Sequence, residues 1–456
     1  MEKDEAQFKK MTQTPIPKLV ASLAFPATVS MLITSIYNLA DTFFVSQLDT
    51  SASGAVGVVF SLMTIIQAVG FTLGMGSGSL LSRRLGGKDK KAADMYASSA
   101  FYLAILLGAV IALFGKLFTK QLMTALGATE TILPYAVAYG NYILYAAPVM
   151  SGSFVLNNLL RSEGKASLAM VGLVTGGILN IILDPIFIFS LNMGTAGAAL
   201  ATLISQCISF VILLSMFIFK KSSTSLSPKN ITFKPKAYLE IVSVGMPSLS
   251  RQGLASVATI LLNRMAMPYG DAAIAGMSIV GKVSMLVLCI CLGVGQGFMP
   301  VAGYNYGAKI FGRVRKSFQF TVITATILMT VMAIVCYALA PNILRLFRAE
   351  DADVVTIGTA ALRAQCYSMP FLATSVCTNM VLQSLGKSVR ATILSCCRQG
   401  IFFIPLIMIL PKYIGIAGVE FTQAISDVLT FFVSIPLILI FLKGLKKEEQ
   451  NAEKQI

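Results

Sequence analysis

Histidine and tryptophan are absent from this 456-residue chain, and charged residues are scarce. The lack of histidine excludes Ser-His-Asp and Cys-His catalysis and also histidine-ligated zinc or haem. Since no serine or carboxylate dyad can be placed either, we expect a protein that is not an enzyme. Charged residues make up 12 % and hydrophobic residues 56 % of the chain, whereas soluble domains carry about 25 % charged residues. A polytopic membrane protein is therefore expected.

Two further kinds of motif are missing. The eight cysteines contain no CxxC pair and lie in apolar runs, so we expect free thiols that serve as small apolar residues. The glycine-rich runs 74–78 and 293–297 have no preceding strand and no GK[ST] ending, so they are not nucleotide loops. Close helix packing accounts for them instead, and the chain shows no basis for direct ATP coupling.

Twelve apolar runs are long enough to cross a bilayer, and runs of this length indicate helices. We therefore expect an all-α membrane protein with twelve transmembrane helices in two six-helix bundles. The approximate spans are 19–46, 54–81, 95–118, 133–159, 167–190, 196–219, 238–266, 273–303, 317–341, 354–383, 391–411 and 414–442.

Basic residues indicate the orientation. With both tails on one side, the tails and loops of that side hold 26 Lys and Arg, against 5 on the other side (Lys116, Lys120, Arg345, Arg348 and Lys412). This excess predicts cytoplasmic termini. It also accounts for most of the net charge of +16, so no nucleic-acid partner is expected. The lack of an amino-terminal targeting signal fits a bacterial plasma membrane, and we expect a monomer there.

The sequence repeats itself at offsets of 219 to 222 residues. Pro26 corresponds to Pro247, and Asn157 to Asn379. Each repeat holds six spans, an even number, so the halves have the same orientation, as in transporters that rock two bundles about a central site. Pro26 itself could give a fixed kink or a hinge. The expected parts are a tail (1–18), a bundle (19–219), a cytoplasmic linker (220–237), a bundle (238–442) and a tail (443–456).

Two carboxylates lie within spans of the first half. A charge at mid-bilayer costs about 2.5–3.5 kcal/mol on insertion scales, so Asp41 and Asp184 each need a partner, a wet cavity or a function. The corresponding second-half residues are apolar: Leu261 or Leu262, and Ile404. The fold therefore does not require the carboxylates, which favours a functional role. The alternative is a buried acid hydrogen-bonded to a neighbouring helix.

The fifth span adds possible ligands for a cation. Asn180 and Asp184 are four residues apart and share a helix face. Pro185 removes a backbone hydrogen bond and leaves carbonyl oxygens free. The Asp184 carboxylate, the Asn180 amide and these carbonyl oxygens could together hold Na⁺. Because desolvation favours the neutral carboxyl group, Asp184 could instead exchange a proton.

Charged residues of the second half suggest a structural pair. Arg363 and Asp427 each lie roughly 10 residues from the external end, about 15 Å deep, so we expect an ion pair between them. Arg398 lies two turns from the cytoplasm and could snorkel to the interface.

Tyrosines recur along one face of the fourth span, at spacings of 4, 3 and 3. They could form an aromatic wall for organic cations, or, in a chain without tryptophan, part of the interfacial belt. They are Tyr135, Tyr139, Tyr142 and Tyr145.

Five motifs, and the order in which they occur, resemble those of the multidrug and toxic compound extrusion (MATE) family. Their residues are most similar to those of its bacterial MepA-like branch. The likeness covers nearly the whole chain. It departs from the family at Gln296, where some members of that branch carry a carboxylate. The motifs are Asn38-Leu-Ala-Asp-Thr-Phe-Phe-Val45, Ser82-Arg-Arg-Leu-Gly-Gly-Lys88, Arg161-Ser-Glu-Gly-Lys165, Asn180-Ile-Ile-Leu-Asp-Pro185 and Gly194-Thr-Ala-Gly-Ala-Ala199.

The resemblance implies an antiporter that exports amphipathic, often cationic, organic compounds in exchange for H⁺ or Na⁺, with no other cofactor. It further implies that ion loading bends the first span and releases the substrate. A flippase for a lipid-linked saccharide is the alternative. Each neutral residue of the implied site could also serve only as hydrogen-bonding contact between helices. The implied coupling site is Asp41, Asn180, Asp184 and Thr202, with Na⁺ possible at the first three, and its implied surroundings are Tyr37, Asn38, Tyr139 and Asn157.

Overall fold

The computed structural model describes residues 2–48, 50–347 and 351–453. Over these ranges the chain consists of helices and connecting turns, with no strand. Arg348, one of the five basic residues assigned to the external side, lies outside the described residues.

The first half contains six long helical spans, as expected, and two short helices. The fifth span is α7 continued by a π-helical turn, η1. The elements are α1 (Glu2–Gln13), α2 (Ile16–Ser46), α3 (Thr50–Gly86), α4 (Lys90–Leu117), α5 (Thr119–Ala125), α6 (Leu133–Ser162), α7 (Ala166–Pro185), η1 (Ile186–Ser190) and α8 (Gly194–Ile218).

The second half repeats this plan after the linker. Its fifth span is built from α13, a π-helical turn and α14. The elements are η2 (Pro228–Asn230), α9 (Pro235–Ala266), η3 (Met267–Tyr269), α10 (Asp271–Gly307), α11 (Phe311–Phe347), α12 (Ala352–Ser384), α13 (Ser388–Cys396), η4 (Cys397–Ile401), α14 (Phe403–Ile414) and α15 (Ile416–Glu453).

Ten of the helical spans in the described ranges are long and apolar enough to cross a membrane by length and composition. The remaining two long helices, α9 and α12, are less apolar because polar and charged side chains interrupt them, including Arg251 and Arg363. Together they make up the twelve predicted transmembrane helices, and the all-α fold is confirmed.

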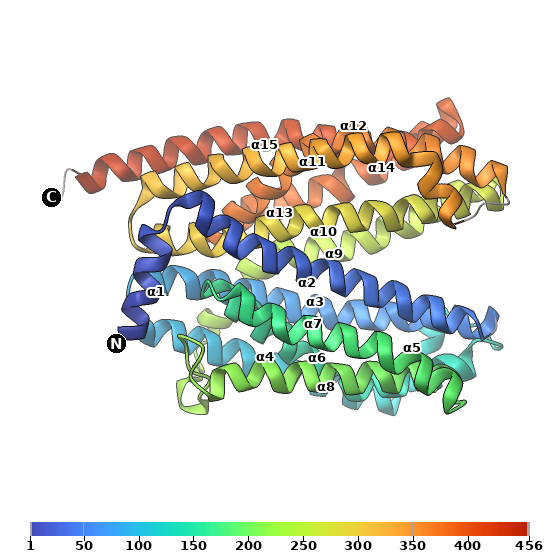
Figure 1. Ribbon diagram of the computed structural model, residues 1–456, viewed down its shortest axis with the longest axis horizontal. Helices are drawn as coiled ribbons and strands as arrows, with labels where there is room; N and C mark the ends of the chain where they lie inside the picture. Colours follow the sequence, from blue (N-terminus) through green and yellow to red (C-terminus); the bar gives the residue numbers. More distant parts are fainter. Residues whose placement is uncertain (1, 49, 348–350, 454–456) are drawn as a thin grey trace.

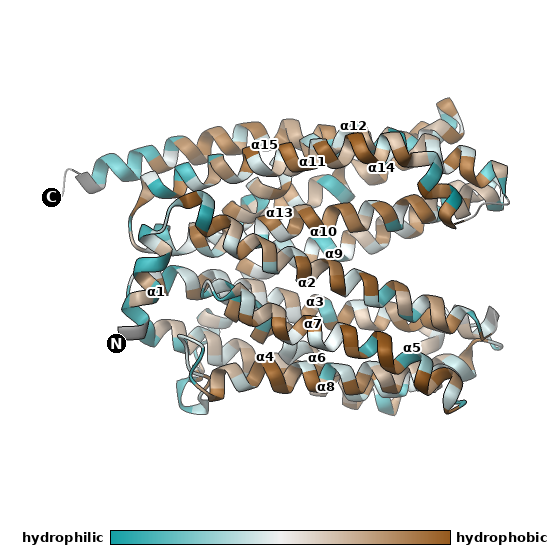
Figure 2. Ribbon diagram, in the orientation of Figure 1, coloured by the Kyte–Doolittle hydropathy of each residue, from teal (hydrophilic) through white to brown (hydrophobic). Residues whose placement is uncertain are grey.

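The helices form two bundles that lie side by side (Figure 1). Both chain ends lie at the same end of the molecule, together with the linker between the halves; we call this the terminal end and the opposite one the far end. Figure 2 shows apolar residues along the middle of the helices and hydrophilic ones gathered at the terminal end. This banding is the one expected for a protein surrounded by lipid.

Three helix pairs make most of the contact between the halves: α2 packs against α10, α3 against α9, and α3 against α10. Glycines permit the close approach. A Cβ atom at Gly76 would collide with the carbonyl of Ile241, and one at Gly293 would collide with Thr28. The glycine-rich runs are therefore packing surfaces, as their sequence context predicts.

The first tail is more ordered than the sequence indicates, because it forms helix α1 at the terminal end. Met11 is fully buried, and its carbonyl accepts a hydrogen bond from Asn305 Nδ2 of α10 (3.1 Å). Gln7 Nε2 donates to the Glu163 carbonyl (2.7 Å). The helix thus contacts α6 of the first half and α10 of the second.

Glu163 also anchors the linker. Its fully buried carboxylate accepts hydrogen bonds from the backbone N–H groups of Ser223 (2.7 Å) and Thr224 (3.1 Å), and Lys165 lies 3.6 Å away. The repeat position carries the apolar residue Leu385. Glu163 therefore belongs to the connection between the bundles.

Candidate functional site

A buried polar cluster lies toward the far end of the first bundle. Asp41 is five residues before the end of α2, about 8 Å along the helix axis. The first turns of α6 bring Tyr139 to it, and the Tyr139 hydroxyl donates to Asp41 Oδ2 (2.9 Å). Asp41 is 8 % exposed and Tyr139 1 %. The structure thus brings Tyr139, one of the implied surrounding residues, into direct contact with Asp41.

The second part of the cluster lies where α7 ends. Asn180 Nδ2 donates to Asp184 Oδ1 and to Thr202 Oγ1 of α8, at 3.3 Å each. All three side chains are buried, and Asp184 is fully so. Pro185 follows Asp184, and the helix continues as the π-helical turn η1. A proline cannot donate to the helical ladder, and π-turns are common at functional sites.

Three oxygens of this cluster lack hydrogen-bond partners: Asp41 Oδ1, Asn180 Oδ1 and Asp184 Oδ2. Asp41 and Asp184 lie near enough for their charges to interact. Within the described ranges, neither forms an ion pair with Lys or Arg. Buried acceptors without donors are costly, and two neighbouring carboxylates repel each other. The cluster therefore suits a small cation or added protons.

The composition of the cluster limits which cation it suits. No group of three or more His, Cys, Asp or Glu able to hold a metal occurs among the described residues. The possible ligand groups are instead two carboxylates, an amide oxygen and a hydroxyl. Such an oxygen-only set with two negative charges fits Na⁺ or H⁺ better than a transition metal, which prefers nitrogen or sulfur ligands.

The implied surrounding residues separate into two groups. Tyr37 is buried one turn before Asp41, with Gln206 of α8 beside its hydroxyl, and Asn38 lies next to it in α2. Asn157 does not join the cluster. It is 18 residues beyond Tyr139 on α6, about 27 Å along the axis.

Asn157 instead ties two helices together. Its Nδ2 donates to the Ala169 carbonyl (3.0 Å), and its repeat equivalent, Asn379, donates to the Ala391 carbonyl (2.6 Å). The same contact in both halves supports the structural reading of this residue.

The expected ion pair between Arg363 and Asp427 is not formed in the structure. Asp427 Oδ1 accepts from Arg398 Nε and from Gln423 Nε2, both at 2.8 Å. Arg363 lies over the Tyr337 ring (5.0 Å). On α12, Ser368 faces Asp427 (3.5 Å), and Arg363 lies five residues earlier, about 140° around the helix.

Arg398 is held inside the bundle by the π-helical turn η4, so it does not snorkel as considered above. Its side chain is 16 % exposed and that of Asp427 4 %. Arg251 of α9 is close enough for its charge to interact with that of Arg398. Asp427 of the second half is thus paired with a cation, unlike Asp41 and Asp184.

The four tyrosines of α6 do not share one environment. Tyr139 is buried against Asp41, whereas Tyr145 is 58 % exposed, with Lys116 Nζ 4.4 Å from its ring centre. A continuous aromatic wall is therefore absent from this face.

One buried cation lies between the halves and is the first residue of a motif shared with the family. Arg161 lies in the last turn of α6 and is 4 % exposed. Its guanidinium donates to Gln296 Oε1 of α10 and to Asn158 Oδ1 (2.7 Å), both neutral groups. The polar residues that precede it in the apolar α6 run, Asn157 and Asn158, were the available signal for burial.

Paired bundles, cross-packed glycine helices and an acidic cluster in one half define a polytopic membrane transporter. The chain belongs to the MATE family, because the family profile described as MatE matches residues 26–186 and 247–409, most of both halves. The resemblance seen in the sequence is confirmed.

Individual relatives agree over nearly the full length. The chain is 27 % identical to the multidrug export protein MepA of Staphylococcus haemolyticus and 25 % identical to that of Staphylococcus saprophyticus, covering 96 % of each chain. It is similar to a solved MATE family transporter in an outward-facing conformation, with 27 % identity and a TM-score of 0.91, covering 96 % of this chain and 98 % of that one. A Pyrococcus furiosus transporter whose structure is described by the reverse polarity of its binding pocket is similar at 26 % identity and a TM-score of 0.90, covering 96 % of this chain and 98 % of that one.

Proposed function

We propose that the protein is a multidrug efflux antiporter, which exports amphipathic organic cations in exchange for inward H⁺ or Na⁺. Asp41, Asn180, Asp184 and Thr202 bind the coupling ion in this proposal. The observation that carries it is the set of three buried oxygens without donors and without a basic neighbour. The MepA relatives, which are multidrug export proteins, support the export of varied organic compounds.

Contacts between the halves suggest how access alternates. Among the described residues, hydrogen bonds between the halves occur at the terminal end and in the middle of the bundles. The one nearest the far end joins Ser35 Oγ and Cys289 Sγ (3.0 Å). In the proposed cycle this state is closed at the terminal end and open toward the far end. The two bundles, 19–219 and 238–442, then rock about the α2–α10 and α3–α9 contacts.

Binding of the ion has to differ between the two states for coupling to occur. Asp41 lies on α2, beyond Pro26, and Asp184 lies on α7, which packs against α2. An ion shared by the two carboxylates would draw these helices together. In our proposal this bends α2, shrinks the space beside it and releases the substrate.

The orientation follows the charge distribution. We propose that the terminal end faces the cytoplasm of a bacterium and that the chain acts as a monomer in the plasma membrane. The Lys and Arg excess in the loops at that end supports this arrangement.

The test is the Asp184→Asn variant in everted vesicles, with ethidium as substrate and a proton or a sodium gradient applied separately. Asparagine keeps the shape of the side chain but cannot exchange a proton and binds a cation poorly. Under both gradients, export should therefore fall to the level of vesicles that lack the protein. The wild-type protein should respond to one gradient, which identifies the ion.

Asp271→Asn serves as the matched control, because Asp271 is exposed at the far end, where α10 begins. It should export like the wild type. Gel filtration of both variants establishes that the protein is folded. Full export by folded Asp184→Asn would refute the coupling site.

A flippase for a lipid-linked saccharide is the second candidate. The partly buried cations Arg251 and Arg398 favour it, because a phosphate-bearing substrate needs positive charge inside the protein. Transport of a fluorescent lipid-linked saccharide, together with no ethidium export under either gradient, would favour this function over antiport.

A further inference from the structure

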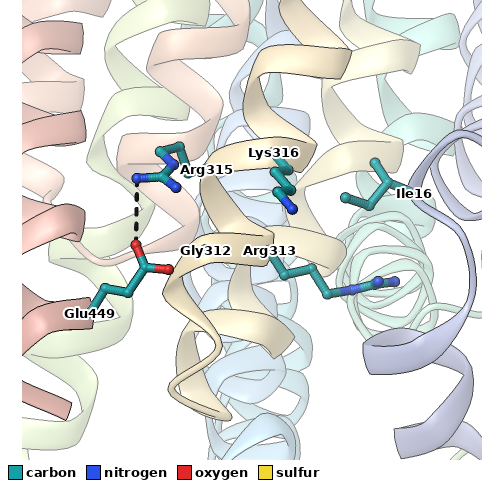
Figure 3. A pocket seen from close by; sticks show the side chains of 6 residues that line it. All are labelled: Ile16, Gly312, Arg313, Arg315, Lys316 and Glu449. Atoms are coloured by element: carbon teal, nitrogen blue, oxygen red, sulfur yellow. Dashed lines mark ion pairs between the residues drawn. The ribbon is translucent and has the colours of Figure 1, made fainter. Parts of the chain in front are cut away.

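A basic pocket of about 440 Å³ lies at the terminal end, away from the acidic cluster. Three segments far apart in the sequence form it: the start of α2, the start of α11 and the end of α15. Figure 3 shows Arg315 and Glu449 on one side of the pocket, and Lys316, Arg313 and Ile16 toward the other. Its lining residues are Ile16, Gly312, Arg313, Arg315, Lys316 and Glu449.

The pocket carries more positive charge than its own residues neutralise. Arg315 Nη1 lies 3.5 Å from Glu449 Oε2, which accounts for the one carboxylate in the lining. Arg313 and Lys316 have no acidic partner among the described residues. Two uncompensated cations on the first turns of one helix favour a ligand with negative charge.

Arg313 has an unused donor as well. Its Nη2 donates to the Thr14 carbonyl, just before α2, which fixes the guanidinium across the pocket. Its Nε is buried and has no hydrogen-bond partner. A guanidinium with a free N–H and a neighbouring ammonium group suits the oxygens of a phosphate group.

The level of the pocket indicates where that phosphate comes from. On α11 the uncharged run begins with Ser317 and Phe318, directly after Lys316. On α15 the apolar run ends at Leu442, before Lys443. Figure 2 shows hydrophilic residues replacing apolar ones along this part of α15. The pocket therefore lies where the headgroups of a bilayer would be, within reach of anionic lipid.

We propose that this pocket binds the phosphate group of an anionic phospholipid, held by Arg313, Arg315 and Lys316. Ile16 and Thr14 belong to the segment that leads into the first bundle, and the cations belong to the second bundle. A bound headgroup would therefore hold the two halves together at the terminal end. The pocket lies apart from the proposed ion site, so the proposal does not depend on which ion is coupled.

Native mass spectrometry of the purified protein with added phosphatidylglycerol tests the proposal. The wild type should retain one phosphatidylglycerol in preference to phosphatidylcholine. Each basic residue near a membrane surface contributes about fivefold in affinity for anionic lipid. The variant Arg313→Ala/Lys316→Ala, which removes the two uncompensated cations, should therefore bind phosphatidylglycerol about 30-fold more weakly.

Lys446→Ala/Lys447→Ala is the matched control, because it removes two exposed cations of α15 outside the pocket lining. It should retain the lipid with nearly wild-type affinity. Lys316→Gln, a single change at an exposed position, replaces the double variant if that one does not fold, and should lose about fivefold.

Three outcomes would overturn the proposal. One is equal loss of phosphatidylglycerol in the pocket and control variants, which would mean general surface attraction. Another is equal retention of phosphatidylcholine and phosphatidylglycerol by the wild type. The third is displacement of phosphatidylglycerol by inorganic phosphate but not by chloride at equal ionic strength, which would identify a site for soluble phosphate.

Discussion

The two halves of the molecule share one backbone plan but treat their buried carboxylates differently. In the first half, Asp184 and Asp41 each keep an oxygen without a hydrogen-bond donor, about 8 Å from the far ends of their spans. In the second half, Asp427 is about 17 Å from the start of α15. It accepts hydrogen bonds from Arg398 and Gln423, both at 2.8 Å.

This difference separates a structural charge from a site that needs a ligand. Asp427 is complete, since the protein itself supplies the opposite charge and the donors. Asp41 and Asp184 are incomplete, and the helices around them supply no cation among the described residues. We infer that the Asp41–Asp184 cluster, and not Asp427, is built to bind and release an ion. The remaining predictions test this contrast from the largest expected effect to the smallest.

The largest effect on stability is expected at Asp427. Asp427→Asn leaves the Arg398 guanidinium buried without its counter-charge, which should lower the free energy of unfolding by about 3–5 kcal/mol. Asp184→Asn removes an unpaired carboxylate and should change it by less than about 1 kcal/mol. Equilibrium unfolding with sodium dodecyl sulfate in mixed micelles measures both.

A double variant serves as the control for the Asp427 prediction. Arg398→Met/Asp427→Leu should recover most of the lost stability, because it removes both charges. Equal destabilisation by Asp427→Asn and Asp184→Asn would contradict the difference between the two halves.

A smaller effect is expected from Tyr139→Phe, which removes the hydroxyl that donates to Asp41. A hydrogen bond to a charged group contributes about 1.5–3 kcal/mol, so ion-driven export should slow about 10- to 100-fold. The rate of ethidium export at a fixed gradient measures this. Tyr142→Phe, on the same helix and only partly buried, should export normally. If both variants behave alike, the Tyr139–Asp41 bond has no part in coupling.

The smallest effects concern a contact that the halves have in common. Asn157→Ala and Asn379→Ala each break a bond from α6 or α12 to the next helix, which should cost about 1 kcal/mol of stability. Asn379 should show slightly more, because it also donates to Ser395 Oγ (2.8 Å). The gradient dependence of export should be unchanged in both. If the gradient dependence changes in Asn157→Ala but not in Asn379→Ala, Asn157 takes part in ion coupling.

The fold follows from features that are local in sequence. Long apolar runs predict the twelve helices because lipid leaves few other backbone structures. The glycine runs 74–78 and 293–297 show where helices approach closely. Asp41 and Asp184 stand out because a charge in such a run is costly wherever the helix ends up.

Partners across helices are less accessible from sequence. Depth alone suggested that Arg363 meets Asp427, but rotation about α12 turns Arg363 toward Tyr337, and the π-helical turn η4 presents Arg398 instead. A shared helix did not place Asn157 beside Tyr139, because 18 residues of helix separate them. Helix α1 depends on Met11 finding a buried position at Asn305, which no pattern within residues 1–18 predicts.

The cross-packing of the halves has a consequence for ancestry. By the repeat, α2 corresponds to α9 and α3 to α10, so the contact of α2 with α10 and that of α9 with α3 are the same contact made twice. This is the isologous geometry of a twofold homodimer. A six-helix protein with these surfaces could pair with a copy of itself inserted in the same direction. Gene duplication and fusion would then preserve the interface while leaving each half free to gain or lose its carboxylates.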